Sequence, residues 1–414
     1  MRINNDGTYA YCRWKVHSDP NIGNIKTQEP LDCFQNTMSS IRTQFLNGEF
    51  PTGCRDCGVM EQHNKVSGRQ KQLLKIGVQT QWFEKTLASS TMRSAFDYSD
   101  AHNGVTTNTV SDWQIDLGNY CNNACIFCNP ETSSRLATEF QQLGLIKQVP
   151  PASWCDDEQL LQKFINTLLN SPQLQYLHFI GGETVITPGF RLILQALVDN
   201  NLAHNITVGF TTNLNVWSDE IAELLKKFQQ VNLGMSIEAM TPINDYVRWP
   251  NKVTRTMELL NRWVKLGQQQ NWLMQLRTTP TCLTVHDLHT VYDYAWEHNI
   301  NVESCNFLHN PAFLRIGVLP REQRQLAKHA IQTWIDQHHI NNNNLVINSR
   351  DPNLTRVQVY QDALSYVNYL NSADDESSRL PELMQYLKLL EGNRKNNILD
   401  YLPQYETLFR SAGY

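Results

Sequence analysis

The sequence Asp116-Leu-Gly-Asn-Tyr-Cys-Asn-Asn-Ala-Cys-Ile-Phe-Cys-Asn-Pro130 places Cys121, Cys125 and Cys128 at C-x3-C-x2-C spacing. The apolar run Trp113–Leu117 comes directly before the cysteines and is typical of a buried strand. Zinc sites are normally closed by four ligands, and no fourth Cys or His lies near this loop in the sequence. Three thiolates on a [4Fe–4S] cluster would leave one iron open to an outside ligand, so the spacing favours a reactive iron–sulfur site.

From residue 111 to about 318, short apolar runs alternate with helical patterns. The candidate strands are Trp113–Leu117, Tyr176–Ile180, Ile206–Thr211, Val231–Ile237, Trp272–Leu276 and Val302–Leu308. The candidate helices between them are 131–144, 157–170, 187–200, 218–228, 252–267 and 286–298. This alternation predicts an α/β fold with parallel strands and crossover helices, either a partial (β/α)6 TIM-type barrel or an open sheet. In both folds ligands bind at the carboxyl ends of the strands.

On these residues the chain resembles the radical S-adenosylmethionine (SAM) superfamily. The hallmark of that family is this cysteine spacing after the first strand of a partial barrel, with an aromatic residue before the third cysteine, where Phe127 stands. The resemblance implies that Cys121, Cys125 and Cys128 hold a [4Fe–4S] cluster whose open iron is chelated by SAM. It also implies reductive cleavage of SAM to methionine and a 5′-deoxyadenosyl radical, which abstracts hydrogen from a substrate. The structural alternative is a zinc loop or thiols that bind no metal.

A Gly-Gly-Glu sequence supports the same resemblance. Gly181, Gly182 and Glu183 directly follow the second candidate strand. Glycines allow close approach of the backbone to a ligand, which a larger side chain would block. The resemblance implies that the Glu183 carboxylate holds the amine of SAM.

Four further residues follow the third and fourth candidate strands. By resemblance, Ser236 and Arg248 would contact the SAM carboxylate, for which the guanidinium fork is suited. The alternatives are a plain strand hydroxyl for Ser236 and a solvated helix charge for Arg248. Thr212 and Asn213 would contact the ribose or the substrate, or else would only cap a turn.

A second group of cysteines, Cys12, Cys33, Cys54 and Cys57, lies near the start of the sequence. Clustered cysteines in a reducing compartment indicate metal or redox chemistry. This region resembles the auxiliary-cluster modules called SPASM and twitch, although those modules usually follow the radical SAM domain. The resemblance implies an auxiliary iron–sulfur cluster held by Cys12, Cys54 and Cys57, with Cys33 as a candidate fourth ligand. A zinc site made by all four thiolates is the alternative.

The predicted organisation has four parts. They are a twitch/SPASM-like auxiliary-cluster domain at 1–70, a linker at 71–110, the radical SAM partial barrel at 111–318 and a C-terminal helical extension at 319–414. Residues 5–7, Asn-Asp-Gly, predict a tight turn. The isolated Cys155, Cys282 and Cys305 are expected in the core, although Cys282 and Cys305 are also candidates for the barrel interior.

Composition narrows the classes of protein. Charged residues make up 18% of the 414 residues, below the roughly 25% usual for globular domains, and the net charge is −5. A nucleic-acid binder should show a basic excess, so such a partner is not expected. No run approaches the roughly 20 apolar residues of a membrane span, and the N-terminal sequence MRINNDGTYAYC lacks the apolar part of a secretory signal. We therefore expect a cytoplasmic protein without a membrane partner.

The resemblance also suggests partners. Relatives with auxiliary modules often modify peptides, so a peptide or protein is the leading substrate hypothesis. The chemistry implies a reducing electron donor such as flavodoxin or ferredoxin. The alternatives are a radical SAM enzyme acting on RNA or a small metabolite, and a non-catalytic zinc-binding protein.

Overall fold

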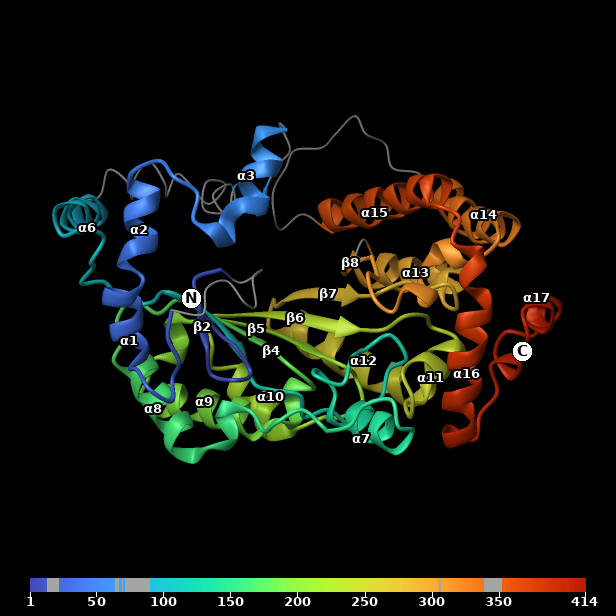
Figure 1. Cartoon of the computed structure of the whole chain (residues 1–414), viewed down its shortest axis with the longest axis horizontal. Helices are drawn as coiled ribbons and strands as arrows, with labels where there is room; N and C mark the ends of the chain where they lie inside the picture. Colours follow the sequence, from blue (N-terminus) through green and yellow to red (C-terminus); the bar gives the residue numbers. More distant parts are fainter. Residues whose placement is uncertain (13–21, 64–66, 69, 71–89, 305–306, 339–351) are drawn as a thin grey trace.

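The computed structural model describes residues 1–12, 22–63, 67–68, 70, 90–304, 307–338 and 352–414. In this part of the chain, one sheet has the strand order β2-β1-β3-β4-β5-β6-β7-β8 (Figure 1). The strands are β1 (Arg2–Ile3), β2 (Tyr9–Ala10), β3 (Asp112–Asp116), β4 (Tyr176–Ile180), β5 (Thr207–Thr212), β6 (Gln230–Ser236), β7 (Leu273–Arg277) and β8 (Asn301–Glu303). Strand β2 is antiparallel to β1, and every other neighbouring pair is parallel.

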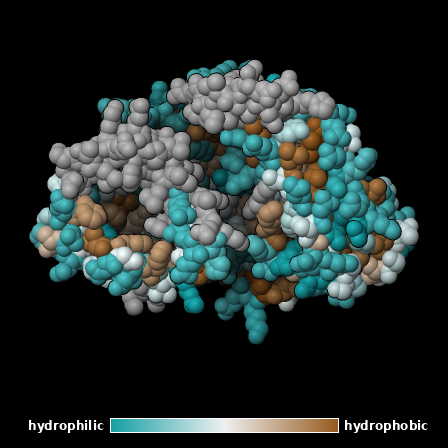
Figure 2. All heavy atoms as spheres, turned by 90° about the horizontal axis from the view of Figure 1, so that it is seen from above, coloured by the Kyte–Doolittle hydropathy of each residue, from teal (hydrophilic) through white to brown (hydrophobic). Residues whose placement is uncertain are grey.

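Helices lie on both sides of this sheet. Their bounds are α1 (Pro30–Asp32), α2 (Ser39–Leu46), α3 (Arg55–Gln62), α6 (Ser90–Ala101), α7 (Ser134–Gln142), α8 (Glu158–Leu169), α9 (Pro188–Asp199), α10 (Asp219–Leu225), α11 (Ile243–Val247), α12 (Val253–Gln269), α13 (Leu288–His298), α14 (Arg321–Gln337), α15 (Pro352–Ser372), α16 (Leu380–Arg394) and α17 (Glu406–Ser411). In Figure 1, α8, α9, α10 and α12 lie below the sheet, whereas α2, α3 and α15 lie above it. Seen from above, the described surface is mostly hydrophilic, with apolar residues in small separate groups (Figure 2).

Aromatic packing holds the lower helices against the sheet. Phe179 of β4 packs edge-on against Phe190 of α9, and Phe190 also contacts Phe210 of β5. Phe210 in turn contacts Trp263 of α12. Side chains alternate between the two faces of a strand. The face of β4 opposite Phe179 therefore carries other residues, among them the half-buried His178. The apolar side of the sheet thus fixes the helices and leaves the other side more polar.

The six strands expected between 111 and 318 are confirmed as a parallel sheet with intervening helices. Strand β4 coincides with its predicted range, and β3, β5, β6 and β7 are displaced by one residue. The prediction Val302–Leu308 was too long, because β8 ends at Glu303; part of that range, 305–306, lies outside the described residues.

Strands β1 and β2 were not predicted, because two residues are too few to show a hydrophobic period. They extend the sheet beyond β3, and β1 pairs with β3 in parallel. The turn between them was predicted correctly: Gly7 has a φ of +88°, and its N–H donates to the Asn4 carbonyl oxygen. In the described part of the chain, no helix has the length and apolar character needed to cross a bilayer.

Candidate functional site

The three cysteines of the motif lie on an irregular loop between β3 and α7, which we call the cysteine loop and define as residues 117–133. Cys125 is 8% exposed, and Cys121 and Cys128 are half-buried. The residues on either side of Cys125 are fixed to residues 247–249, the last residue of α11 and the two that follow it, which we refer to as the segment after α11. The Ala124 N–H donates to the Trp249 carbonyl oxygen at 2.8 Å, and the Ile126 N–H donates to that of Val247 at 3.0 Å.

Each of the three sulfur atoms lies beside a polar group from another part of the site. Asn213 Nδ2 is 3.8 Å from Cys121 Sγ, and Arg248 Nη1 is 4.0 Å from Cys125 Sγ. Thr132 Oγ1 is 3.1 Å from Cys128 Sγ. An amide, a guanidinium and a hydroxyl can all donate to a thiolate, so the surroundings suit sulfur atoms that carry negative charge.

Without a metal the buried thiols hold their protons. Burial raises the pKa of the Cys121 thiol to about 11. Burial also raises the pKa of Cys125, although the nearby Arg248 guanidinium acts in the opposite direction. Metal binding at this loop must therefore release protons, because only the thiolate is a ligand.

The same loop does not form a site for a single ion. Among the residues that the structure describes, no three His, Cys, Asp or Glu side chains gather closely enough to hold one metal ion. A zinc ion needs its ligands around one point, whereas a cubane cluster binds each thiolate at a different iron. Each of the three thiols has a polar group beside its sulfur, which suits thiolate ligands of an iron–sulfur cluster.

The glycines of the Gly-Gly-Glu sequence make room for the cysteine loop. A Cβ on Gly182 would lie 2.3 Å from the Tyr120 carbonyl oxygen, and one on Gly181 would lie 2.4 Å from that of Gly118. The Gly182 N–H donates to the Gly118 carbonyl oxygen at 2.7 Å. The close approach that these glycines permit is therefore to the protein's own backbone.

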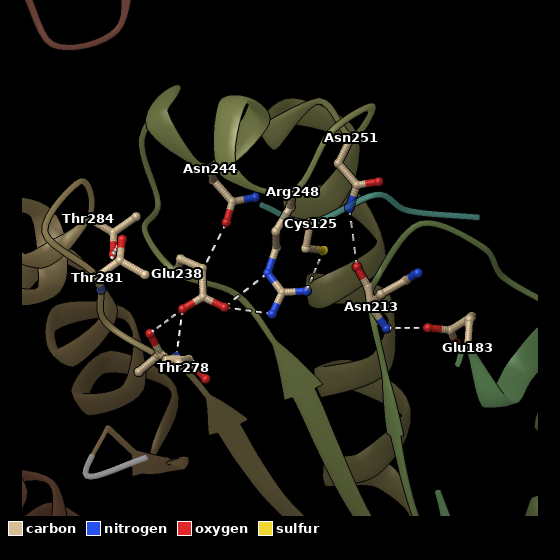
Figure 3. Close-up of polar contacts among 11 residues, drawn as sticks. Cys125, Glu183, Asn213, Glu238, Asn244, Arg248, Asn251, Thr278, Thr281 and Thr284 are labelled. Atoms are coloured by element: carbon tan, nitrogen blue, oxygen red, sulfur yellow. Dashed lines mark hydrogen bonds and ion pairs between the residues drawn. The ribbon is translucent and has the colours of Figure 1, made fainter. Parts of the chain in front are cut away.

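Glu183 ties the end of β4 to the end of β5. Its side chain is buried, and Oε2 accepts from the Asn213 N–H at 2.5 Å (Figure 3). The other oxygen, Oε1, accepts from the Val185 N–H at 3.3 Å. The Thr212 side chain also bonds to this carboxylate. Burial raises the pKa of Glu183 to about 7, against the effect of these hydrogen bonds. The structure thus brings together Thr212, Asn213 and Glu183, which the sequence singled out separately.

Arg248 is a buried, ion-paired residue and not a solvated helix charge. Its Nη2 and Nε donate to Glu238 Oε1 at 2.6 and 3.1 Å (Figure 3). The other carboxylate oxygen of Glu238 accepts from Thr278 Oγ1 at 2.9 Å and from the Thr279 N–H at 2.6 Å. The Arg248 guanidinium also lies over the Phe127 ring, 5.5 Å from its centroid. Glu238 thereby fixes the Arg248 cation beside Cys125 Sγ.

Sequence reasoning missed Glu238, although the residue lies two positions after Ser236 at the end of β6. A carboxylate at a strand end is a signal, but only the fold reveals its partner. Ser236 itself is half-buried and lies opposite Arg277 in the register of β6 and β7. Its proposed contact with SAM remains a prediction.

Residues 115–282 match the family model of the Radical SAM superfamily. This segment is therefore similar to the radical SAM domains that the model describes. The matched segment begins in β3 and includes the cysteine loop, Glu183, Glu238 and Arg248. No curated protein matches the chain.

Several solved structures resemble this chain in part. SuiB of Streptococcus suis bound to S-adenosylmethionine has 13% identity and a TM-score of 0.36, over 66% of this chain and 61% of SuiB. SuiB bound to its precursor peptide SuiA has 14% identity and a TM-score of 0.38, over 65% and 60%. The enzyme anSMEcpe with bound AdoMet has 15% identity and a TM-score of 0.39, over 55% and 61%. The chain thus spans about three fifths of the length of these structures, and a likeness this low assigns no reaction to it.

The N-terminal cysteines lie outside the segment that matches the family model. Cys33 is fully buried in the core, where its thiol donates to the Ile22 carbonyl oxygen at 2.9 Å, and burial raises its pKa to about 12. Cys12 follows β2, Cys54 ends a short 3₁₀ turn, and Cys57 lies on α3. Cys33 therefore behaves as a core thiol, and the described residues gather no group of three ligands here for a single ion such as zinc.

The isolated cysteines have core positions where they are described. Cys155 is buried and its thiol donates to the Leu117 carbonyl oxygen at 3.2 Å, and Cys282 is fully buried. The expectation of core packing is confirmed for both. Cys305 lies outside the described residues.

The fit of Gly182 against Tyr120 predicts the effect of adding one methyl group. Gly182→Ala should force the cysteine loop away from β4, lowering the free energy of unfolding by about 1–3 kcal/mol. It should also reduce the iron bound after anaerobic reconstitution. Gly392→Ala is the matched control, because nothing lies within 4 Å of its added Cβ. Urea unfolding and iron assay of both variants test this; wild-type behaviour of Gly182→Ala would contradict the packing argument.

The raised pKa of Glu183 predicts a dependence of stability on pH. The folded state holds the proton up to about pH 7 and the unfolded chain releases it near 4.5, so the folded state binds more protons between these values. The stability that Glu183 contributes should therefore fall as pH rises through this window, by about 3 kcal/mol in total.

Glu183→Gln removes this titration. The difference between the wild-type and Glu183→Gln unfolding free energies should change across pH 4.5–7 and become constant above that range. Urea unfolding of the metal-free proteins at a series of pH values measures it. A difference that is independent of pH would show that Glu183 titrates normally.

Proposed function

We propose that this chain is a radical SAM enzyme in which Cys121, Cys125 and Cys128 hold a [4Fe–4S] cluster. In this family, SAM bound at such a cluster is split reductively to methionine and a 5′-deoxyadenosyl radical, which abstracts hydrogen from the substrate. The observation that carries the proposal is the open cysteine loop within the matched segment. Its three thiols have donors beside each sulfur and, among the described residues, no arrangement that would close around a single ion.

In the proposal, Arg248 and Asn213 tune the cluster. A cation and an N–H donor beside ligand sulfurs favour the reduced state, because they compensate the added negative charge. Arg248 Nη1 faces Cys125 Sγ, and Asn213 Nδ2 faces Cys121 Sγ. Glu238 keeps the guanidinium in this place, so we assign Glu238 a positioning role.

The predicted contact between Arg248 and the SAM carboxylate must use other N–H groups than the fork of Nε and Nη2. Glu238 already accepts from Nε and Nη2 of this guanidinium, and Nη1 faces Cys125. A fork-shaped contact through Nε and Nη2 is thus taken, whereas the N–H groups of Nη1 and the second N–H of Nη2 make no bond to Glu238. We therefore propose that the Nη1 side of Arg248 donates to the SAM carboxylate, with Ser236 as a further donor.

Glu183 keeps the role of holding the SAM amine. The two carboxylate oxygens together accept the Asn213 and Val185 N–H groups and the Thr212 side chain, which leaves one lone pair for a further donor. A nearby ammonium group favours the ionised carboxylate and lowers its pKa. SAM binding should thus convert Glu183 from a partly protonated group at pH 7 to a charged one. We propose contacts with ribose or substrate for Thr212 and Asn213.

The remaining parts of the proposal rest on the sequence resemblance. They are a peptide or protein substrate, an electron donor of the flavodoxin or ferredoxin type, and an N-terminal domain at 1–70 with an auxiliary iron–sulfur cluster. We propose Cys12, Cys54 and Cys57 as ligands of that cluster. The buried Cys33 thiol, which donates to Ile22, does not support Cys33 as the fourth ligand.

Anaerobic reconstitution tests the proposed function. The wild-type protein should bind roughly eight irons per chain if both sites hold cubane clusters, and SAM with dithionite should release 5′-deoxyadenosine. Cys125→Ala should abolish this release and leave roughly four irons, because the auxiliary site is separate. Cys282→Ala is the control, since Cys282 is a buried core cysteine.

Two outcomes would contradict the proposal. One is tightly bound zinc in the wild-type protein with no iron uptake, which would favour a non-catalytic zinc protein. The other is undiminished 5′-deoxyadenosine release by Cys125→Ala.

A further inference from the structure

The backbone on both sides of Cys125 is held from two directions. Its N–H groups are bound by the segment after α11, as described above, and its carbonyl oxygens are bound by α16. The Tyr386 hydroxyl donates to the Ile126 carbonyl oxygen at 2.9 Å across 260 residues of sequence. Arg394 Nη2 donates to the Ala124 carbonyl oxygen at 2.8 Å across 270 residues. All four backbone groups next to Cys125 thus have partners far away in the sequence.

Arg394 is itself fixed by a buried ion pair. Its Nη2 and Nε donate to the two carboxylate oxygens of Glu139 at 2.6 and 2.9 Å, and both side chains are almost fully buried. Asn393 Nδ2 also donates to Glu139, at 3.0 Å. Glu139 belongs to α7, the helix that follows the cysteine loop. The pair therefore joins α16, α7 and the loop in a single buried network.

Two aromatic contacts fix the same region. The Arg394 guanidinium lies over the ring of Trp249, 5.1 Å from its centroid. The Tyr386 ring packs against Phe313 and Phe140. Burial raises the pKa of the Tyr386 hydroxyl well above its usual range, so this group stays a donor at every working pH. In Figure 1, α16 runs along the end of the sheet to which the strand arrows point, next to α11.

We propose that α16 braces the cysteine loop, and that Tyr386 and Arg394 are positioning residues for the [4Fe–4S] cluster. This inference rests on the proposed function and extends it to a helix outside the segment that matches the radical SAM family. The loop has no helix or strand of its own to set the direction of Cys125. Its backbone carbonyls accept from a hydroxyl and a guanidinium, and these bonds fix where the Cys125 sulfur is presented.

The test uses Tyr386→Phe, which removes one hydroxyl and keeps the ring packing. The matched control is Tyr294→Phe. Tyr294 is buried on α13, and its hydroxyl makes one comparable bond, to Asn261 Oδ1 at 2.6 Å. Both variants should fold, and their metal-free forms should melt at similar temperatures, because each loses one hydrogen bond.

The reconstituted proteins should differ. Tyr386→Phe should lose iron to 2,2′-bipyridine about fivefold faster than wild type, the effect of losing about one net hydrogen bond. Its reduced cluster should also show a shifted midpoint potential and a changed electron paramagnetic resonance spectrum. Tyr294→Phe should match the wild type in all three measurements.

Three results would overturn the inference in distinguishable ways. If Tyr386→Phe keeps the wild-type iron loss, potential and spectrum, α16 does not position the cluster. If both variants change alike, α16 contributes only general stability. If the wild-type protein takes up no iron–sulfur cluster, the proposed function itself fails, and this is seen before any variant is made.

Discussion

The backbone of the cysteine loop has to satisfy its polar groups without a helix or a strand, and the surrounding structure is arranged to meet this requirement. Buried N–H and C=O groups without partners are strongly disfavoured. The Gly118 and Tyr120 carbonyl oxygens accept from the Gly-Gly-Glu turn, and the N–H groups of Ala124 and Ile126 donate to the segment after α11. The carbonyl oxygens of the latter two accept from α16. A loop held in this way can present three sulfur atoms in one orientation.

Two buried ion pairs contact this loop. Their contribution to the stability of the fold does not by itself explain why they are there. Taking a carboxylate and a guanidinium out of water costs several kcal/mol, which their attraction repays only with good geometry and further hydrogen bonds. Glu238 has such bonds from Thr278 and Thr279, and Glu139 has one from Asn393. Apolar residues would fill the same space at less cost. The pairs instead place one guanidinium beside the Cys125 sulfur and another on the Ala124 carbonyl oxygen.

The sequence predicted the sheet well because its strands carry long apolar runs, and it predicted the cysteines because their spacing is rare. Residues that act in pairs were harder to find. The partner of Arg248 was taken to be an outside ligand, whereas Glu238, ten residues earlier, already occupies two of its donors. The Gly181–Gly182 pair is expected to allow close approach of a ligand, which remains a prediction, and the structure adds close contacts of both glycines with the cysteine loop. In both cases the residue type was informative, and the partner depended on tertiary contacts that the sequence does not contain.

The contacts made by the C-terminal helices are the hardest to predict from the sequence. Arg394 and Glu139 lie 255 residues apart, and neither belongs to a recognisable motif. Yet the segment matching the family ends at residue 282, so it contains Glu139, Ala124 and Ile126 but none of their partners on α16. Cut at that point, the chain would bury a carboxylate without its cation, a loss of about 3–5 kcal/mol, and would leave two carbonyl oxygens of the cysteine loop without donors. The conformation of the cysteine loop therefore depends on residues outside the matched segment, and that segment by itself cannot maintain this conformation.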